Sequence, residues 1–155
     1  MTGDLRGWAR ARRLALGLAA VAMATVAGGC ADAPSPQARV VGPDGAPRLA
    51  VRVELAVTPA ERVRGLRGHA PLGPRDGLLI VTPGPSELCI VNDGVSFAID
   101  EVFARADGVV AAVEREVAAG DPTPHCHEGI QSVLEVAAGV AARVRPGDRL
   151  IAPAP

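Results

Sequence analysis

The apolar residues of this 155-residue chain lie in short runs, and turns rich in glycine and proline separate these runs. In the clearest run, Val51, Val53, Leu55 and Val57 alternate with polar or smaller residues. A period of two places successive side chains on opposite faces of a strand, so this run is typical of a strand with one face on a core. We therefore predict a mainly β fold: a single small barrel-like or sandwich-like domain with one or two short helices.

Turn motifs divide the chain into seven or eight expected strands. The segments 42–45 and 106–108 are typical of hairpin turns, because each combines aspartate and glycine between two apolar runs. The segment 82–85 contains two prolines and is expected to end a strand. The segment 118–128 is expected to be a loop. The expected strands cover residues 39–41, 46–57, 77–81, 88–91, 95–104, 109–117, 130–136 and 149–151.

One short helix is expected directly after the longest alternating run. Thr58 can cap its first turn, Pro59 suits the first helical position, and Glu61 lies three residues after the cap. Gly68 is well placed as a cap at the carboxyl end of the helix. The pattern therefore predicts a helix that begins after Thr58 and ends near Gly68.

Residues 1–29 have the composition of a secretory signal. Four arginines precede an apolar stretch, residues 14–27, which is too short to span a bilayer as a stable helix. The segment 26–30 resembles a bacterial lipobox, in which Cys30 is lipidated after cleavage. We therefore predict a cleaved signal peptide and an exported lipoprotein, anchored by Cys30 at the periplasmic or extracellular face of a bacterial membrane. The alternative is an ordinary signal peptide that is cut nearby and leaves Cys30 as a free thiol.

The predicted mature protein is acidic. Residues 30–38 are expected to comprise the lipidated cysteine and a flexible linker, and residues 39–155 the β-rich domain. Removing residues 1–29 takes away four arginines and one aspartate, which leaves 12 arginines and 16 acidic residues, a net charge of −4. An acidic domain with two phenylalanines as its only aromatic residues is poorly suited to bind nucleic acid. The expected partners are the membrane, through the lipid, and an envelope protein or small ligand.

The most chemically suggestive segment, residues 124–128, reads Pro-His-Cys-His-Glu. In an extended backbone, His125 and His127 point to one side and Cys126 to the other. Two imidazoles can supply nitrogen ligands to zinc or copper, and Glu128 is a candidate third ligand. The alternative is a solvated loop with two titrating imidazoles, in which case no cofactor is expected.

Two cysteines remain once Cys30 is lipidated. In an exported chain, the pair Cys89 and Cys126 favours a disulfide. This bond would close a loop of about 38 residues and would contribute roughly 3–4 kcal/mol to stability. The alternative is a hydrolase in which Cys126 is the nucleophile and a neighbouring histidine is the base. That chemistry requires a reactive thiolate, which an oxidising compartment disfavours.

A series of short motifs resembles the bacterial and archaeal family known as domain of unknown function 192. The motifs span roughly residues 50–151, and their order and spacing carry the resemblance. They are Val53-Glu54-Leu55-Ala56, Thr58-Pro59-Ala60-Glu61-Arg62, Gly65-Leu66, Gly77-Leu78-Leu79-Ile80-Val81, Phe97-Ala98-Ile99-Asp100, Phe103, Ala106-Asp107-Gly108, Val133-Leu134-Glu135 and Gly147-Asp148. The resemblance implies a small barrel-like β domain, often behind a signal peptide, and it implies no established activity.

Arg62 and Asp100 match polar positions of the family pattern and are candidate binding residues. One interpretation makes them a charged pair that faces a cleft. The alternative is structural, with Arg62 on the helix surface and Asp100 capping a strand. The chain resembles a divergent member, because Arg67 stands where the family usually has methionine and Ala98 where it usually has proline.

These patterns predict a non-catalytic, lipid-anchored envelope domain that recognises a partner or small ligand through its loops. The fold alone names no ligand. A metal-binding or metal-delivery role for His125 and His127 is the second hypothesis. A hydrolase is the third hypothesis. It ranks last because the chain contains neither a Gly-x-Ser-x-Gly motif nor a two-histidine zinc helix.

Overall fold

The computed structural model describes residues 35–154 of the chain. The predicted signal peptide, the lipobox and Cys30 lie outside the described residues. Within residues 35–154 the chain forms one seven-stranded sheet and one short helix, so the predicted mainly β fold is confirmed. The described part of the chain contains no helix that is both long and apolar enough to cross a membrane.

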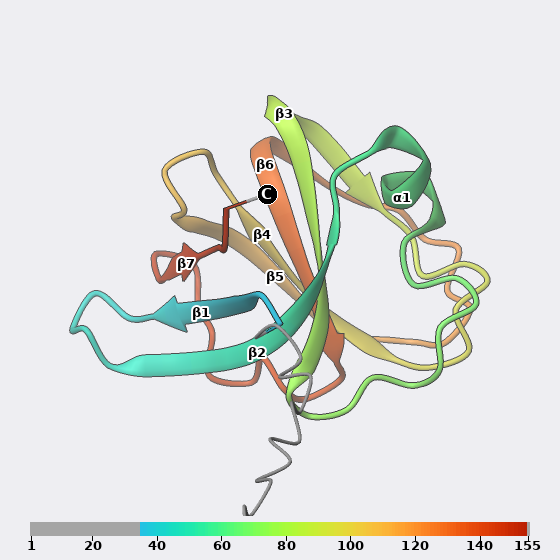
Figure 1. The fold of residues 1–155 in the computed structure, drawn as a ribbon, viewed down its shortest axis with the longest axis horizontal. Helices are drawn as coiled ribbons and strands as arrows, with labels where there is room; N and C mark the ends of the chain where they lie inside the picture. The colour runs from blue at the N-terminus through green and yellow to red at the C-terminus, as the bar shows by residue number, and fades with distance from the viewer. Residues whose placement is uncertain (1–34, 155) are drawn as a thin grey trace, which may run out of the picture. The chain divides into compact units, whose positions relative to one another are not determined.

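The strands follow one another in the sheet in the order β5-β4-β6-β3-β2-β1-β7 (Figure 1). All neighbours are antiparallel except β2 and β3, which run parallel and are connected through α1. The first strand also pairs with the last, with Val40 opposite Leu150. The elements are β1 (Gln37–Val41), β2 (Pro47–Ala56), α1 (Pro59–Arg64), β3 (Asp76–Ile90), β4 (Ile99–Ala104), β5 (Val110–Val117), β6 (His125–Ala137) and β7 (Arg149–Ile151).

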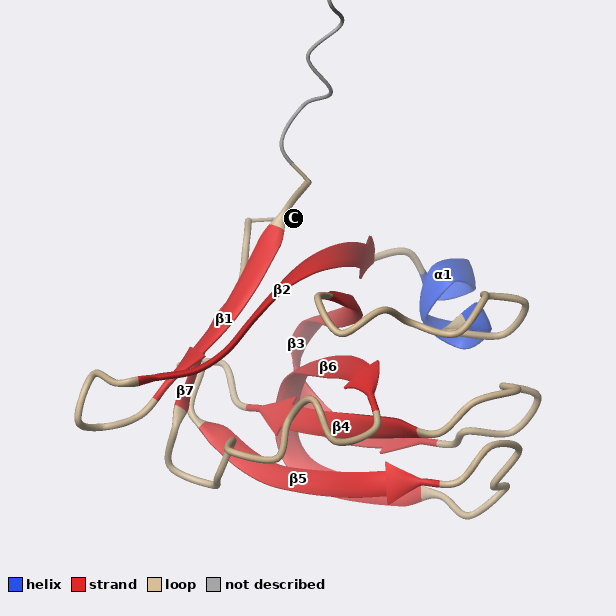
Figure 2. Cartoon of the chain, turned by 90° about the horizontal axis from the view of Figure 1, so that it is seen from below, coloured by secondary structure: helices blue, strands red, loops and turns tan. Residues whose placement is uncertain are grey.

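The sheet curls into a half-barrel, and Figure 2 shows β1 and β2 rising away from the layer that contains β4 and β5. The two longest strands, β3 and β6, pair with each other over most of their length at the centre of this sheet. Apolar side chains cover both faces of the curled sheet. One cluster includes Val53, Leu79, Val102 and Leu134; the other includes Leu66, Ile80, Ile90, Phe103 and Ile130.

The predicted hairpins are present, but the boundaries predicted for what are β3 and β6 are wrong. The strands expected at 77–81 and 88–91 form one strand, β3, which continues through the two prolines of segment 82–85. The prolines fit there because the register with β6 is irregular between Val81 and Ser86, so they interrupt no regular ladder. The expected loop at 118–128 ends earlier than predicted, because β6 begins at His125.

The helix is also shorter than predicted. It ends at Arg64, and Gly65, rather than Gly68, caps it with a φ of 51°. Val57 was expected on the buried face of the strand before the helix. It lies just beyond the carboxyl end of β2 and is 39% exposed. The domain begins at β1, so Ala38, which is fully buried, lies within the segment predicted to be a linker.

Candidate functional site

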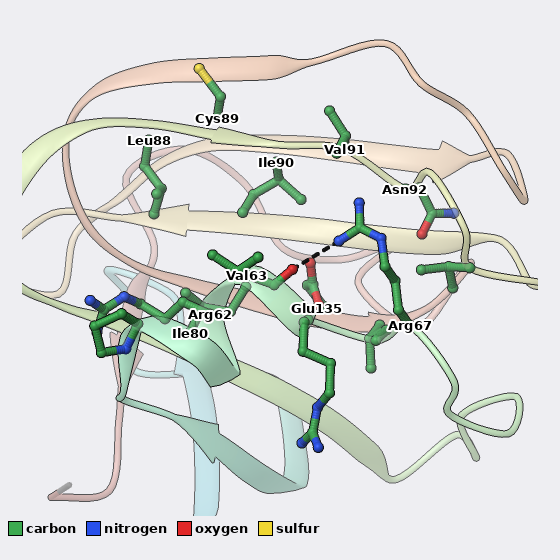
Figure 3. A pocket seen from close by; sticks show the side chains of 15 residues that line it. Arg62, Val63, Arg67, Ile80, Leu88, Cys89, Ile90, Val91, Asn92 and Glu135 are labelled. Carbon is green, nitrogen blue, oxygen red and sulfur yellow. Dashed lines mark hydrogen bonds between the residues drawn. The ribbon is translucent and has the colours of Figure 1, made fainter.

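A pocket of about 450 Å³ lies between α1, the turn that follows it, and the carboxyl-terminal part of β3 (Figure 3). Its walls are mainly apolar and its polar groups are few, as is usual for small-molecule sites. The polar side chains are Arg62, Arg64, Arg67, Asn92 and Glu135, and the apolar wall includes Val63, Leu66, Ile80, Leu88, Ile90 and Val95.

Helix α1 is held in place by its ends rather than by a buried face, since none of its residues is buried. Thr58 and Glu61 form a capping box: the Thr58 hydroxyl accepts from the backbone N–H of Glu61, and the Glu61 carboxylate accepts from that of Thr58. Hydrogen bonds to the Glu61 carboxylate, first from the backbone N–H of Thr58 and then from that of Val57, lower the pKa of Glu61. The Arg62 guanidinium donates to the carbonyls of Val57 and Val81, which joins the helix to β3.

Removing the cap should therefore loosen the pocket's cover. We expect Thr58→Ala to lower the free energy of unfolding by about 1 kcal/mol, because it leaves a helix-end donor without its partner. Urea denaturation followed by far-ultraviolet circular dichroism measures this change. Thr58→Ser keeps the hydroxyl and is expected to keep most of the stability. An equal loss in both variants would contradict the capping argument.

Arg67 extends across the pocket from the turn after α1. Its guanidinium donates to the Val63 carbonyl at 2.9 Å, and Figure 3 shows it on the same side of the pocket as the Glu135 carboxyl. The side chain also passes close to Gly94: a β-carbon at that position would lie 3.3 Å from Nε of Arg67. The arginine is therefore held by its neighbours, while most of its N–H groups have no hydrogen bond within the described residues.

Asn92 fixes the turn that closes the same side of the pocket. It is 1% exposed, and its amide donates to the carbonyls of Phe97 at 3.0 Å and Ala118 at 2.8 Å. Its oxygen is buried and has no hydrogen-bond partner. Asn92 thus offers an unused acceptor beside the arginine donors.

Glu135 on β6 lies at the bottom of the pocket and is 4% exposed. Its Oε2 atom is buried and has no hydrogen-bond partner. Burial, and after it the charge of Glu101, raises the pKa of Glu135 to about 8, against a smaller opposing effect of Arg67. At neutral pH this side chain is therefore mostly a neutral carboxylic acid with a proton to donate.

Glu101 on β4 lies directly opposite Glu135 in the sheet and is fully buried. One of its oxygens, Oε2, lies 3.0 Å from Nδ1 of His125, and the other has no hydrogen-bond partner. Burial raises the pKa of Glu101, and the hydrogen bond and charge of His125 partly offset that effect. The pocket floor therefore rests on two neighbouring buried carboxyl groups.

The two histidines point to the same side of β6, as predicted for an extended segment, but they meet different partners. Nδ1 of His125 faces Glu101, whereas Nε2 of His127 lies 2.9 Å from Glu114, and the His127 ring packs on Phe103. Glu128 is exposed, and the structure does not bring it together with the histidines.

Among residues 35–154, the one group of three metal-ligating side chains within mutual reach is Glu87, Cys89 and Cys126. Its two sulfur atoms are bonded to each other in a disulfide, so they are not thiolate ligands. This disulfide is the bond that the cysteine count favoured. It joins directly opposite residues of β3 and β6, and both cysteines are exposed.

Arg62 and Asp100 do not form a charged pair, and the structural alternative describes Asp100 better. Arg62 lines the pocket, whereas Asp100 is fully buried on β4, where its side chain alternates with that of Glu101. The Asp100 carboxylate accepts from the backbone N–H groups of Glu116 and Ala141, both at 2.9 Å. Glu116 has a φ of 53°, so this hydrogen bond supports a backbone conformation that few residues other than glycine adopt.

Asp100→Asn is expected to lower the free energy of unfolding by about 1–3 kcal/mol, because an amide supplies one acceptor oxygen where two buried donors need one each. Chemical denaturation of the variant measures the loss. Asp93→Asn, a change in an exposed turn, is the matched control and should have little effect. Equal stabilities of the two variants would contradict the role given to Asp100.

Sequence reasoning missed Arg67, Asn92, Glu101 and Glu135 as site residues. For the two glutamates, the available signal was acidic residues inside two apolar runs: Asp100 and Glu101 in 99–104, and Glu135 in 130–136. An acid within a strand is usually on a solvated face, so the pattern alone did not identify burial. Only the curled sheet, with apolar cover on both faces, places these carboxyls inside.

Comparison with known proteins agrees with this architecture. The chain is 26% identical to a proposed transcription regulator from Sinorhizobium meliloti 1021, with a TM-score of 0.71 over 76% of this chain and 92% of that one. It is 29% identical to a protein of unknown function from Novosphingobium aromaticivorans, with a TM-score of 0.69 over 75% of this chain and 83% of that one. None of the curated proteins matches it.

The family model gives the more specific result. Residues 40–152 match the model of domain of unknown function 192 (DUF192), which is described as an uncharacterised ACR. The match spans nearly the whole described fold, from β1 through β7. The chain therefore belongs to the DUF192 family.

Proposed function

We propose that this DUF192 domain is a non-catalytic binding module, which holds a small molecule in the pocket beneath α1. The observation that carries the proposal is the chemistry of the lining: apolar side chains form the wall, and hydrogen-bonding groups of Arg67, Asn92 and Glu135 face one part of it. A ligand that fits has an apolar body and a polar head group.

The lining residues also favour binding over catalysis. They include no serine, threonine or histidine, and their one cysteine, Cys89, is bonded in the disulfide. A nucleophile with an adjacent base is therefore not among them. Glu135 could exchange a proton, but acid–base catalysis needs a second group at the reacting atoms.

We further propose that the domain is exported and held at a bacterial membrane by lipid on Cys30. The six residues 31–36 lie between that cysteine and β1, and a fully extended segment of this length reaches about 20 Å. The pocket would then stay near the membrane surface. Cys30→Ala should move the protein from the membrane fraction to the soluble fraction, and retention in the membrane would contradict the lipid anchor.

An environment-sensitive dye with an apolar body and a sulfonate head, anilinonaphthalene sulfonate, tests the pocket. We expect saturable binding of one dye per purified protein. Val63→Trp places a large ring in the pocket from a residue that is 76% exposed on α1, so it should block binding without disturbing the core. Ala60→Trp adds the same ring to α1 outside the lining and is the matched control. Equal dye binding in both variants would exclude this pocket as the site.

A further inference from the structure

The charges around this pocket specify the ligand more closely. Resting on the binding function proposed above, we propose that the ligand is an organic anion, such as a carboxylate with an apolar tail, and that the pocket binds it together with a proton held by Glu101 and Glu135. The geometry that carries this inference is Arg67, which has no salt-bridge partner within residues 35–154 and lies on the same side of the pocket as Glu135, together with the adjoining buried carboxyls of Glu135 and Glu101.

The positive charges are available to a ligand. Of the three arginines in the lining, Arg64 forms an ion pair with Glu54, at 3.1 Å. Arg62 and Arg67 form no salt bridge within residues 35–154, and their hydrogen bonds go to backbone carbonyls. Guanidinium groups whose positions are already fixed match the planar oxygen pair of a carboxylate.

The carboxyl groups beneath them are not free to ionise together. Glu101 and Glu135 are opposite each other on neighbouring strands, and side chains in such positions are close neighbours. Each has a buried oxygen without a partner. Two like charges at this spacing in a buried site repel strongly, so the pair retains a proton at neutral pH.

Few other titratable groups face Glu101 and Glu135 among the described residues. Glu101 is faced by His125 and His127 of β6 and by Glu114 of β5, and Glu135 is faced by Arg67. Glu54 lies in the same row across the sheet, but Leu78 separates it from Glu135. His125 is 20% exposed, and its Nδ1 lies 3.0 Å from Oε2 of Glu101, so this histidine separates the buried pair from solvent.

Protonation of Glu135 favours an anion in two ways. The neutral acid leaves the charge of Arg67 uncompensated, and it offers an O–H donor to the ligand's head group. Once ionised, Glu135 would neutralise Arg67 and repel an anion. With the pKa of Glu135 raised to about 8, the change should occur between pH 7 and pH 9.

Isothermal titration calorimetry with three eight-carbon probes tests the proposal: octanoate, octylammonium and 1-octanol. The first two keep their charges at both pH 6.5 and pH 9. We expect octanoate to bind most tightly at pH 6.5 and about tenfold more weakly at pH 9, because binding then requires that Glu135 take up a proton. Octanol should show a much smaller dependence on pH.

Two variants test separately the positive charge of Arg67 and the proton held by Glu135. Glu135→Gln keeps a donor but cannot ionise, so octanoate affinity should become nearly independent of pH. Arg67→Gln should weaken octanoate binding roughly tenfold or more at both pH values. Glu87→Gln removes an exposed carboxylate outside the pocket and should match the unmodified protein.

The outcomes distinguish this inference from the proposed function. Tighter binding of octylammonium than octanoate would overturn the anion assignment while the binding function stands. Equal octanoate affinity at pH 6.5 and pH 9 in the unmodified protein would overturn the proton linkage alone. Failure of all three probes and of the sulfonate dye would overturn the pocket as a binding site, and the present inference with it.

Discussion

Glu135→Gln is expected to stabilise the domain by several kcal/mol at pH 9 and to change its stability little at pH 4. The raised pKa of Glu135, about 8 in the folded protein against 4.5 for the free side chain, sets this difference. Below pH 4.5 the carboxyl is protonated in both states. Between pH 4.5 and 8 the unfolded chain releases the proton while the folded chain retains it, so stability falls as pH rises.

The expected size of this stability difference follows from the interval between the two pKa values of Glu135, in the unfolded and in the folded chain. About 3.5 pH units at about 1.4 kcal/mol each gives an upper value of about 5 kcal/mol, all of it lost by pH 9. Glutamine does not titrate and fits the same space, so the variant avoids the loss. Glu101, whose pKa is also raised, steepens the fall in stability of both proteins in the same direction.

Urea denaturation from pH 4 to pH 9, followed by far-ultraviolet circular dichroism, measures this prediction. The pKa values of Asp44, Glu61 and Asp121 are lowered, so their stabilising effects disappear only at acidic pH, below the interval of interest. Glu87→Gln serves as the control for the loss of a carboxylate. A stability difference between Glu135→Gln and the unmodified protein that stays constant with pH would refute the argument.

The second large effect concerns the disulfide. Replacing Cys89 and Cys126 together with serine should lower the free energy of unfolding by about 4 kcal/mol, because the bond closes a loop across a sequence separation of 37 residues. Both cysteines are exposed, so serine leaves no cavity and buries no new polar group. The loss therefore measures the constraint on the unfolded chain.

Reductant provides the control for this experiment. Dithiothreitol should destabilise the unmodified protein by a similar amount, since the bond is exposed to solvent, and should leave the double-serine variant unchanged. A loss below about 1 kcal/mol in both tests would mean that the two strands are paired equally well without the bond. The dye used to test the pocket adds a local readout, because Leu88 and Ile90, on either side of Cys89, line its wall.

The sequence was sufficient for features that depend on neighbouring residues. The alternation in β2, the hairpin turn before Val110 and the capping box at Thr58 all follow from local geometry, and the structure contains each of them. The disulfide was predicted from cysteine count and compartment. The first three features have a physical cause that acts within a few residues. The disulfide could be predicted because only two cysteines remain to pair once Cys30 is lipidated.

Features that depend on the curl of the sheet could not be predicted. Whether Glu135 faces solvent or a core depends on what covers both faces of β6, and that cover comes from distant segments such as α1 and β3. The prolines of segment 82–85 predicted the end of a strand, because proline is rarely found inside a regular sheet. The irregular pairing with β6 that accommodates them cannot be seen in the sequence of one strand. The pocket is likewise a product of this long-range arrangement.

The pairing of β1 with β7 has a consequence for when the fold can be completed. A strand near the start of the described chain finds its outer neighbour only after residues 149–151 have been synthesised. Closure over so long a stretch of chain is entropically slow, so we expect it to come late in folding. A ribosome-bound chain would thus remain incomplete along one edge of β1. For the export proposed here, this delay would help to keep the chain loosely folded until it has crossed the membrane.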